Sequence, residues 1–209
     1  MKDLLVFAAD ADTGAFIGAL LDRPEALGIR RVTFDIKRHD RRDPGMVTDG
    51  PERARLWKGH YEKALLIWDH EGSGRERKQT PAQAAADIAG RMDDVTWANN
   101  HTVVVLEPEL EIWLWHCESA LRAHLDVSAD ELLKWIEVFA GRARETPEAV
   151  KRDSPKDLFE DIVKVRLKRT ISPRDFEHIG RRASIRGLMS CPSFAAIAGA
   201  LREWFPPEP

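Results

Sequence analysis

The stretch ALLIWDHEGSG, residues 64–74, decides the fold. Its first five residues form an unbroken apolar run that stops abruptly at Asp69, His70 and Glu71, followed by three small turn residues. A short apolar run bounded by turn residues predicts a strand buried on both faces, as found in parallel sheets. Ligands collect beyond the carboxyl ends of such strands, so the stretch predicts two carboxylates at a functional edge of the sheet.

Asp69 and Glu71 lie two residues apart, so on an extended backbone their side chains would point the same way and share one divalent cation. Carboxylate oxygens are the ligands that Mg²⁺ prefers, and Mn²⁺ takes the same ligands. The alternative is a strand that ends in a solvated turn, because Asp, Gly and Ser are ordinary turn residues. The stretch alone is compatible with both interpretations.

Three further segments are expected to be strands, and two of them also end in acids. Residues 4–8 are followed by Asp10 and Asp12, residues 32–36 alternate apolar and polar side chains, and residues 102–106 are followed by Glu109 and Glu111. The carboxyl ends of parallel strands meet at one edge of a sheet. The candidate metal ligands are therefore Asp10, Asp12, Asp69, Glu71, Glu109 and Glu111.

Helical patterns separate and follow these strands. Thr13 is expected to cap a helix over residues 13–21, Thr80 one over residues 81–92, and Ser128 one over residues 129–141. Residues 37–50 are polar and contain Pro44 and Gly45, which predicts a loop, and residues 51–61 predict a helix. Beyond residue 108 every apolar pattern is helical. The expected fold is α/β, with a mainly parallel sheet flanked by helices and a helical C-terminal half.

We expect residues 1–125 to form the α/β core and residues 126–209 to form a helical extension packed on the same domain. A chain of 209 residues is long enough for such a core. The first residues carry acids directly after a short apolar run, and no segment is long and apolar enough for a membrane span. Cys117 and Cys191 suggest neither a disulfide framework nor a zinc site, so we expect a cytoplasmic protein without a membrane partner.

The net charge of -3 gives no global sign of nucleic-acid binding, so such a role depends on local patches. Residues 151–186 contain 11 Lys and Arg against 6 Asp and Glu. A second basic run contains Lys37, Arg38, Arg41 and Arg42, which could touch phosphates. The alternative in both segments is an ordinary charged surface.

Several motifs together resemble a known family. They are the strand, acid and helix of residues 4–21, DHEG at 69–72, PELEIWLW at 108–115, PK at 155–156 and CPSFAAIAGAL at 191–201. In this order, over nearly the whole chain, they look like a Toprim-like family of small bacterial defence-associated proteins. That family is similar to the nuclease domain of OLD-type proteins and to RloB-like proteins. The resemblance implies a Toprim-like fold that holds one or two magnesium ions.

The resemblance also implies roles for single residues. Asp69 and Glu71 stand where the family has Asp-x-Asp, and Lys156 is the basic residue that would neutralise the reacting phosphate, so these three are the implied catalytic residues. Lys156 could instead be a solvated residue in the first turn of a helix. Toprim domains carry a glutamate after the first strand, where this chain has Ala9, followed by Asp10.

Three functions are compatible with these observations. The first is a Mg²⁺- or Mn²⁺-dependent nuclease or nicking component of an anti-phage defence system, acting on nucleic acid with other defence proteins as possible partners. The second is a degenerate, non-catalytic Toprim subunit or scaffold of a defence complex, suggested by Ala9. The third is a metal-dependent phosphotransferase or phosphatase for a small molecule, which acid-ended strands also permit.

Overall fold

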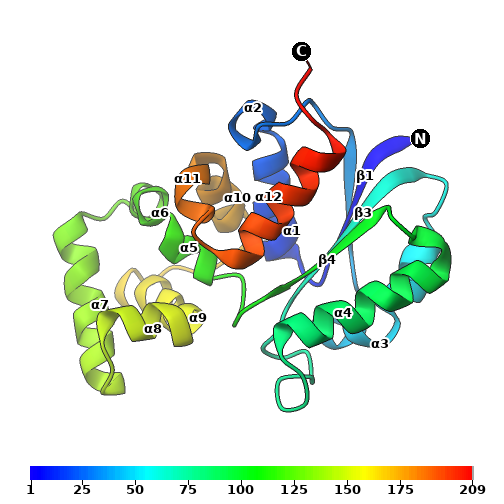
Figure 1. Ribbon diagram of the computed structural model, residues 1–209. Helices are drawn as coiled ribbons and strands as arrows, with labels where there is room; N and C mark the ends of the chain where they lie inside the picture. Colours follow the sequence, from blue (N-terminus) through cyan, green and yellow to red (C-terminus); the bar gives the residue numbers. More distant parts are fainter. Residues whose placement is uncertain (209) are drawn as a thin grey trace.

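A computed structural model describes residues 1–208 of the chain. It contains one four-stranded sheet in the order β2-β1-β3-β4, in which every neighbouring pair is parallel. The strands are β1 (Lys2–Ala8), β2 (Phe34–Arg38), β3 (Tyr61–Asp69) and β4 (His101–Leu106). The expected α/β fold with a parallel sheet is confirmed (Figure 1). The register pairs Ala8 with Ile67 and Asp69 with Leu106, so the carboxyl ends of these strands lie together.

Helices cover both faces of the sheet, and each face has its own hydrophobic core (Figure 1). Helices α1 (Ala11–Leu21), α10 (Pro173–Arg182) and α12 (Pro192–Trp204) cover one face, where α10 packs on α1 and α12 packs on β4. Helices α3 (Arg42–Arg55) and α4 (Pro81–Met92) cover the other. Alternate side chains of the strands enter the two cores, so the central strands are buried on both faces.

The C-terminal half is helical, as expected, with no strand between residues 107 and 208. The remaining helices are α2 (Pro24–Leu27), α5 (Ile112–His116), α6 (Glu118–Leu125), α7 (Ala129–Ala143), α8 (Pro147–Asp153), α9 (Pro155–Glu160) and α11 (Ile185–Leu188), with π-helical turns η1 (Asp93–Trp97) and η2 (Asp161–Arg166). Side chains from α7 to α12 belong to the same hydrophobic cluster as β1. A domain boundary after residue 125 stays a prediction. Across residues 1–208, no helix has the length and apolar character needed to cross a bilayer.

Two of the three expected helix caps are confirmed, and one is wrong. Thr80 and Ser128 each accept a hydrogen bond from the third helical residue in a capping box. Helix α1 begins earlier than expected, because Asp10 is its cap: Asp10 Oδ1 accepts a hydrogen bond from the Thr13 amide at 2.8 Å. Thr13 is instead a buried residue in the first turn.

The expectation of a loop over residues 37–50 is wrong, because α3 begins at Arg42. Pro44 lies in the first turn, where its missing N–H costs nothing, and Met46 and Val47 are buried in the core under α3. Asp49 has a non-helical φ of -140° and marks a kink before Pro51. Burial therefore overrides the low helix propensity of the Gly and Pro residues in this segment.

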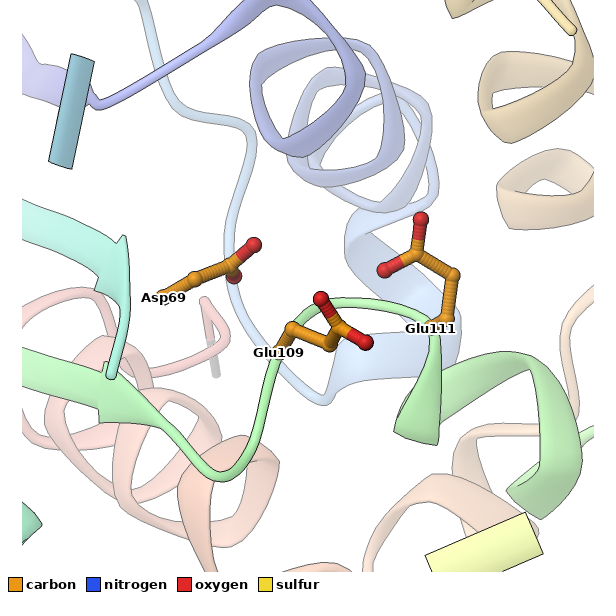
Figure 2. Close-up of side chains that lie close together, drawn as sticks. All are labelled: Asp69, Glu109 and Glu111. Carbon is orange, nitrogen blue, oxygen red and sulfur yellow. The ribbon is translucent and has the colours of Figure 1, made fainter. Parts of the chain in front are cut away.

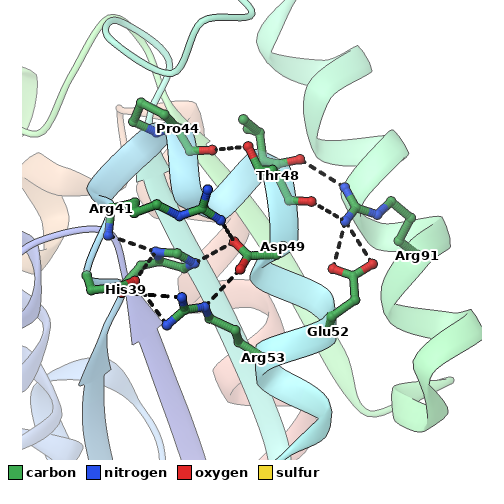
Figure 3. Close-up of polar contacts among 10 residues, drawn as sticks. His39, Arg41, Pro44, Thr48, Asp49, Glu52, Arg53 and Arg91 are labelled. Atoms are coloured by element: carbon green, nitrogen blue, oxygen red, sulfur yellow. Dashed lines mark hydrogen bonds and ion pairs between the residues drawn. The ribbon is translucent and has the colours of Figure 1, made fainter.

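A polar network holds the start of α3 against the end of β2 (Figure 3). The amide of Arg41 donates to His39 Nδ1 at 3.1 Å, so the ring proton lies on Nε2, which donates to Asp49 Oδ1 at 3.0 Å. Arg53 also donates to Asp49, at 3.0 Å. This packing requires a glycine at position 45, because a Cβ there would lie 2.1 Å from His39 Nδ1.

We predict that Gly45→Ala lowers the free energy of unfolding by about 1 to 3 kcal/mol, because the new methyl group overlaps a buried imidazole that cannot move without breaking its bonds. The matched control is Gly141→Ala in α7, where nothing lies within 4 Å of the added Cβ. Better helix propensity should raise the stability of that variant by up to about 1 kcal/mol. Urea unfolding measures both; equal stability of Gly45→Ala and wild type would contradict the role of His39.

Candidate metal centre

Acidic side chains from several loops meet in one cavity of about 410 Å³ at the carboxyl edge of the sheet. All six predicted metal ligands line it, and so does Lys156. The charged residues around this acidic cavity are Asp10, Asp12, Arg42, Asp43, Asp69, Glu71, Glu109, Glu111, Lys156, Glu160 and Lys164. The structure therefore brings the residues together as the acid-ended strands predicted.

Three of these acids form the tightest group. Asp69, Glu109 and Glu111 each offer a carboxylate oxygen, and these oxygens lie within 4.8 Å of one another (Figure 2). The turn after β4 carries both glutamates beside the end of β3 (Figure 2). The Leu110 amide donates to Asp69 Oδ1 at 2.9 Å, which orients the Asp69 carboxylate toward both glutamates.

Glu71 lies in the same cavity but differs from the expected geometry. The extended backbone ends at Asp69, and Glu71 follows in a turn, where it is exposed and its amide donates to the Pro108 carbonyl at 3.1 Å. Among residues 1–208, no group of three potential ligands includes Glu71. The alternation that would align Asp69 with Glu71 is therefore lost, and a cation shared by this pair stays a prediction.

The acids after β1 have separate environments. Ala9, at the position where the resembled family has glutamate, is buried. Asp10 is committed to its cap bond with Thr13, whereas Asp12 lines the cavity from the first turn of α1. Burial, together with the charge of Asp10, raises the pKa of Asp12 to about 6. Asp12, unlike Asp10, does not cap the helix and could turn toward a cation. Neither residue belongs to the group of three.

Asp43 is a site residue that the sequence analysis missed. Its Oδ1 accepts the Asp69 amide at 2.9 Å, and burial raises its pKa above the ordinary value despite that hydrogen bond. Asp43 lies in the segment expected to be a loop, where a charged side chain is ordinarily solvated, so the sequence did not predict it as a ligand. The available signal was its place just after a strand of the parallel sheet, at the edge where ligands bind.

Burial and mutual repulsion raise the pKa values of these acids when no cation is present. Burial raises the pKa of Glu111 to about 7 and, with the charges of Asp43 and Glu111, raises that of Asp69 well above its usual range. Burial also raises the pKa of Glu109. Lys156 Nζ lies 3.3 Å from Glu109 Oε2, and its charge partly offsets the rise in the pKa of all three acids. Burial alone would lower the pKa of Lys156. The negative charges of the nearby acids have a larger effect and raise this pKa, so Lys156 keeps its positive charge.

The residues fit a divalent cation. The cavity holds eight carboxyl groups against three basic side chains, an excess of negative charge that neighbouring residues do not neutralise. Glu111 Oε2 is buried without a hydrogen-bond partner, which is costly for a carboxylate unless another group binds it. A donor set made only of oxygens matches a hard divalent cation rather than a softer metal.

Comparisons of the chain with family models, with curated proteins and with solved structures found no match.

We predict that Asp69→Asn, Glu109→Gln and Glu111→Gln each weaken Mn²⁺ binding at least about tenfold, because each removes a charged oxygen from the group of three. Calorimetric titration measures the affinity. Glu62→Gln, an exposed acid at the start of β3, is the matched control and should bind as wild type does. Wild-type affinity in the Asp69→Asn, Glu71→Gln double variant would place the metal elsewhere.

We predict that the metal-free protein loses stability as pH rises from about 4.5 toward 7. The folded state keeps a proton on Glu111, whose pKa rises from 4.5 to about 7, and the unfolded state releases it, so unfolding is favoured across this window. The contribution is roughly 3 kcal/mol. Urea unfolding in EDTA at several pH values measures it. Glu111→Gln should flatten the profile, and an unchanged profile in that variant would contradict the assignment.

Proposed function

We propose that the protein is a Toprim-like nuclease that hydrolyses phosphodiester bonds in nucleic acid with Mg²⁺ or Mn²⁺. The observation that carries the proposal is the buried group Asp69, Glu109 and Glu111 with Lys156 beside it. A cation bound there would neutralise these acids and allow a phosphate to approach them. The motif resemblance supports the substrate class and a role in bacterial defence, with other defence proteins as partners.

One set of side chains would hold the cation. Asp69, Glu109 and Glu111 would hold the cation, with Asp12 and Asp43 close enough to line the same cavity. The bound ion would supply charge stabilisation at the phosphate and a lowered pKa for a bound water. The chain's own residues then orient the substrate around that ion.

Lys156 and Glu71 supply the two remaining roles. Lys156 keeps its positive charge and is partly exposed, so its Nζ can also contact a phosphate oxygen. Glu71 is exposed at the cavity, where its carboxylate can accept a proton from the attacking water. His70 is less suited to that task, because its Nε2 lies 3.0 Å from the Gln79 carbonyl and is used there.

One observation favours a second candidate, the degenerate and non-catalytic subunit. Ala9 supplies no ligand at the position where the resembled family has glutamate, and the adjacent Asp10 serves as a helix cap. Asp12 would have to supply the missing ligand. In this alternative the acidic cavity still binds a cation, but the cation stabilises the fold or a protein complex instead of promoting hydrolysis.

We predict that the protein nicks plasmid DNA or cleaves RNA only with Mg²⁺ or Mn²⁺. Asp69→Asn should abolish cleavage while nucleic-acid binding largely survives, and Lys156→Ala should reduce cleavage by about 100-fold because charge stabilisation at the phosphate is lost. Gel assays with labelled strands measure cleavage. Lys134→Ala, an exposed lysine on α7, is the control and should be fully active.

Two outcomes would contradict the proposed nuclease activity. Metal binding without cleavage of any DNA or RNA would favour the non-catalytic subunit. Hydrolysis of a simple phosphomonoester, with no cleavage of nucleic acid, would instead indicate the small-molecule phosphatase.

A further inference from the structure

A second cavity, of about 600 Å³, lies beside the acidic cavity at the carboxyl ends of β1 and β2. We call it the basic groove. Its charged lining residues are Asp10, Lys37, Arg38, Asp40 and Arg42. Asp10 and Arg42 line both cavities, so the two adjoin. A ligand that occupied the acidic cavity could therefore continue into the groove.

The cations of the basic groove are free to bind an external anion. Within residues 1–208, the side chains of Lys37, Arg38 and Arg42 make no ion pair and no hydrogen bond, whereas the neighbouring Arg41 pairs with Asp49. The acids of the groove are engaged: Asp10 caps α1, and Asp40 Oδ1 lies 3.0 Å from Arg53 Nη1. Cations that form no ion pair within the chain are available to bind phosphate.

Most cations in the basic region of residues 151–186 form ion pairs within the chain. Seven of its eleven Lys and Arg residues form ion pairs inside the chain. They are Lys151, Arg152, Lys156, Lys164, Arg166, Arg169 and Arg181. The excess charge counted in the sequence is thus largely compensated. The other four, Lys168, Arg174, Arg182 and Arg186, form no ion pair within residues 1–208, but none of them lines the acidic cavity, whereas Arg42 of the basic groove does.

Arg42 is held between the two cavities by an unusual backbone. Its φ is 52°, in the left-handed region that residues other than Gly and Asn rarely adopt. Its amide donates to the His39 carbonyl at 3.2 Å, which ties this conformation to the end of β2. The charge of Arg42 partly offsets the rise in the pKa of Asp12 and of Asp43, so it acts on the acidic cavity.

We propose that the basic groove binds the phosphate next to the one placed at the acidic cavity, with Lys37, Arg38 and Arg42 as its ligands. The substrate class is then a nucleic-acid strand of at least two phosphates rather than a free mononucleotide. The identity of the strand rests on the proposed function, whereas phosphate binding in the groove does not. The groove lies where open α/β sheets bind ligands, next to the N-terminal end of α1.

The test is binding of a fluorescent single-stranded oligonucleotide in EDTA, where cleavage is blocked and no metal contributes. Lys37→Gln with Arg38→Gln should weaken binding by about tenfold and lower the dependence of log K on log salt by about 1.4, since each removed contact contributes about 0.7 for a single strand. The matched control is Arg55→Gln with Lys134→Gln, two exposed cations outside the groove with the same change in net charge.

A third variant challenges the assignment directly. Lys168→Gln with Arg174→Gln removes cations from another cavity, of about 520 Å³, which His124 and Asp175 also line. This variant should bind the oligonucleotide as wild type does. Loss of binding there instead of in the groove variant, or equal loss in the control, would overturn the proposal. Arg38→Gln alone, at an exposed position, repeats the test if the double variant unfolds at a lower temperature.

Competition identifies the ligand class. A nucleoside monophosphate or inorganic phosphate at equal phosphate concentration should displace the strand poorly, and efficient displacement would overturn the assignment to a strand. The cleavage assay with Mn²⁺ separates the two proposals. If the groove variant loses binding while wild type never cleaves, the groove is retained and the nuclease is rejected. If wild type cleaves and the groove variant binds and cleaves equally well, the groove is rejected and the nuclease is retained.

Discussion

The structure depends on the buried carboxylate of Asp69 at the end of β3. Its amide donates to Asp43, and its Oδ1 accepts the Leu110 amide, so one residue joins the start of α3, the end of β3 and the turn after β4. The adjacent amide of His70 donates to the Leu106 carbonyl at 2.8 Å and completes the connection. Because the four strands are parallel, these segments all reach the same edge of the sheet. The positions of Asp43, Glu109 and Glu111 in the cavity follow from this arrangement.

This arrangement is costly for the metal-free protein. Several carboxyl groups lie close together, three of them buried, and Lys156 compensates them only in part. Removal of a charge from water without full compensation is unfavourable, so the acids hold protons or bind a cation. The hydrophobic cores on the two faces of the sheet provide stability far from the cavity. A site that is destabilising by itself is thus held in place by a rigid sheet, as expected for a binding site.

The segment after β2 links the acids to the free cations. The His39 and Asp49 network orders residues 39–53 (Figure 3). This order places Asp43 toward Asp69 and leaves Lys37, Arg38 and Arg42 at the neighbouring groove. Opposite charges are therefore adjacent but separately arranged: the acids face a cavity suited to a cation, and the unpaired bases face a groove suited to phosphate. A metal and a polyanion bound together would satisfy both.

The sequence by itself determined the parallel α/β class, the approximate strands and the convergence of acids at one edge, because period, burial and strand-end chemistry are local properties of the chain. Asp69, Glu109 and Glu111 were all found this way. Only the tertiary structure decided which acids come within reach of one another. Asp10 caps α1, and Glu71 lies exposed at the cavity in the turn after β3. Asp43, in a segment expected to be a loop, lies in the site and accepts the Asp69 amide. The same holds for charge: the sequence counts cations, but ion pairing depends on contacts between distant segments, so only the fold shows which of them remain free.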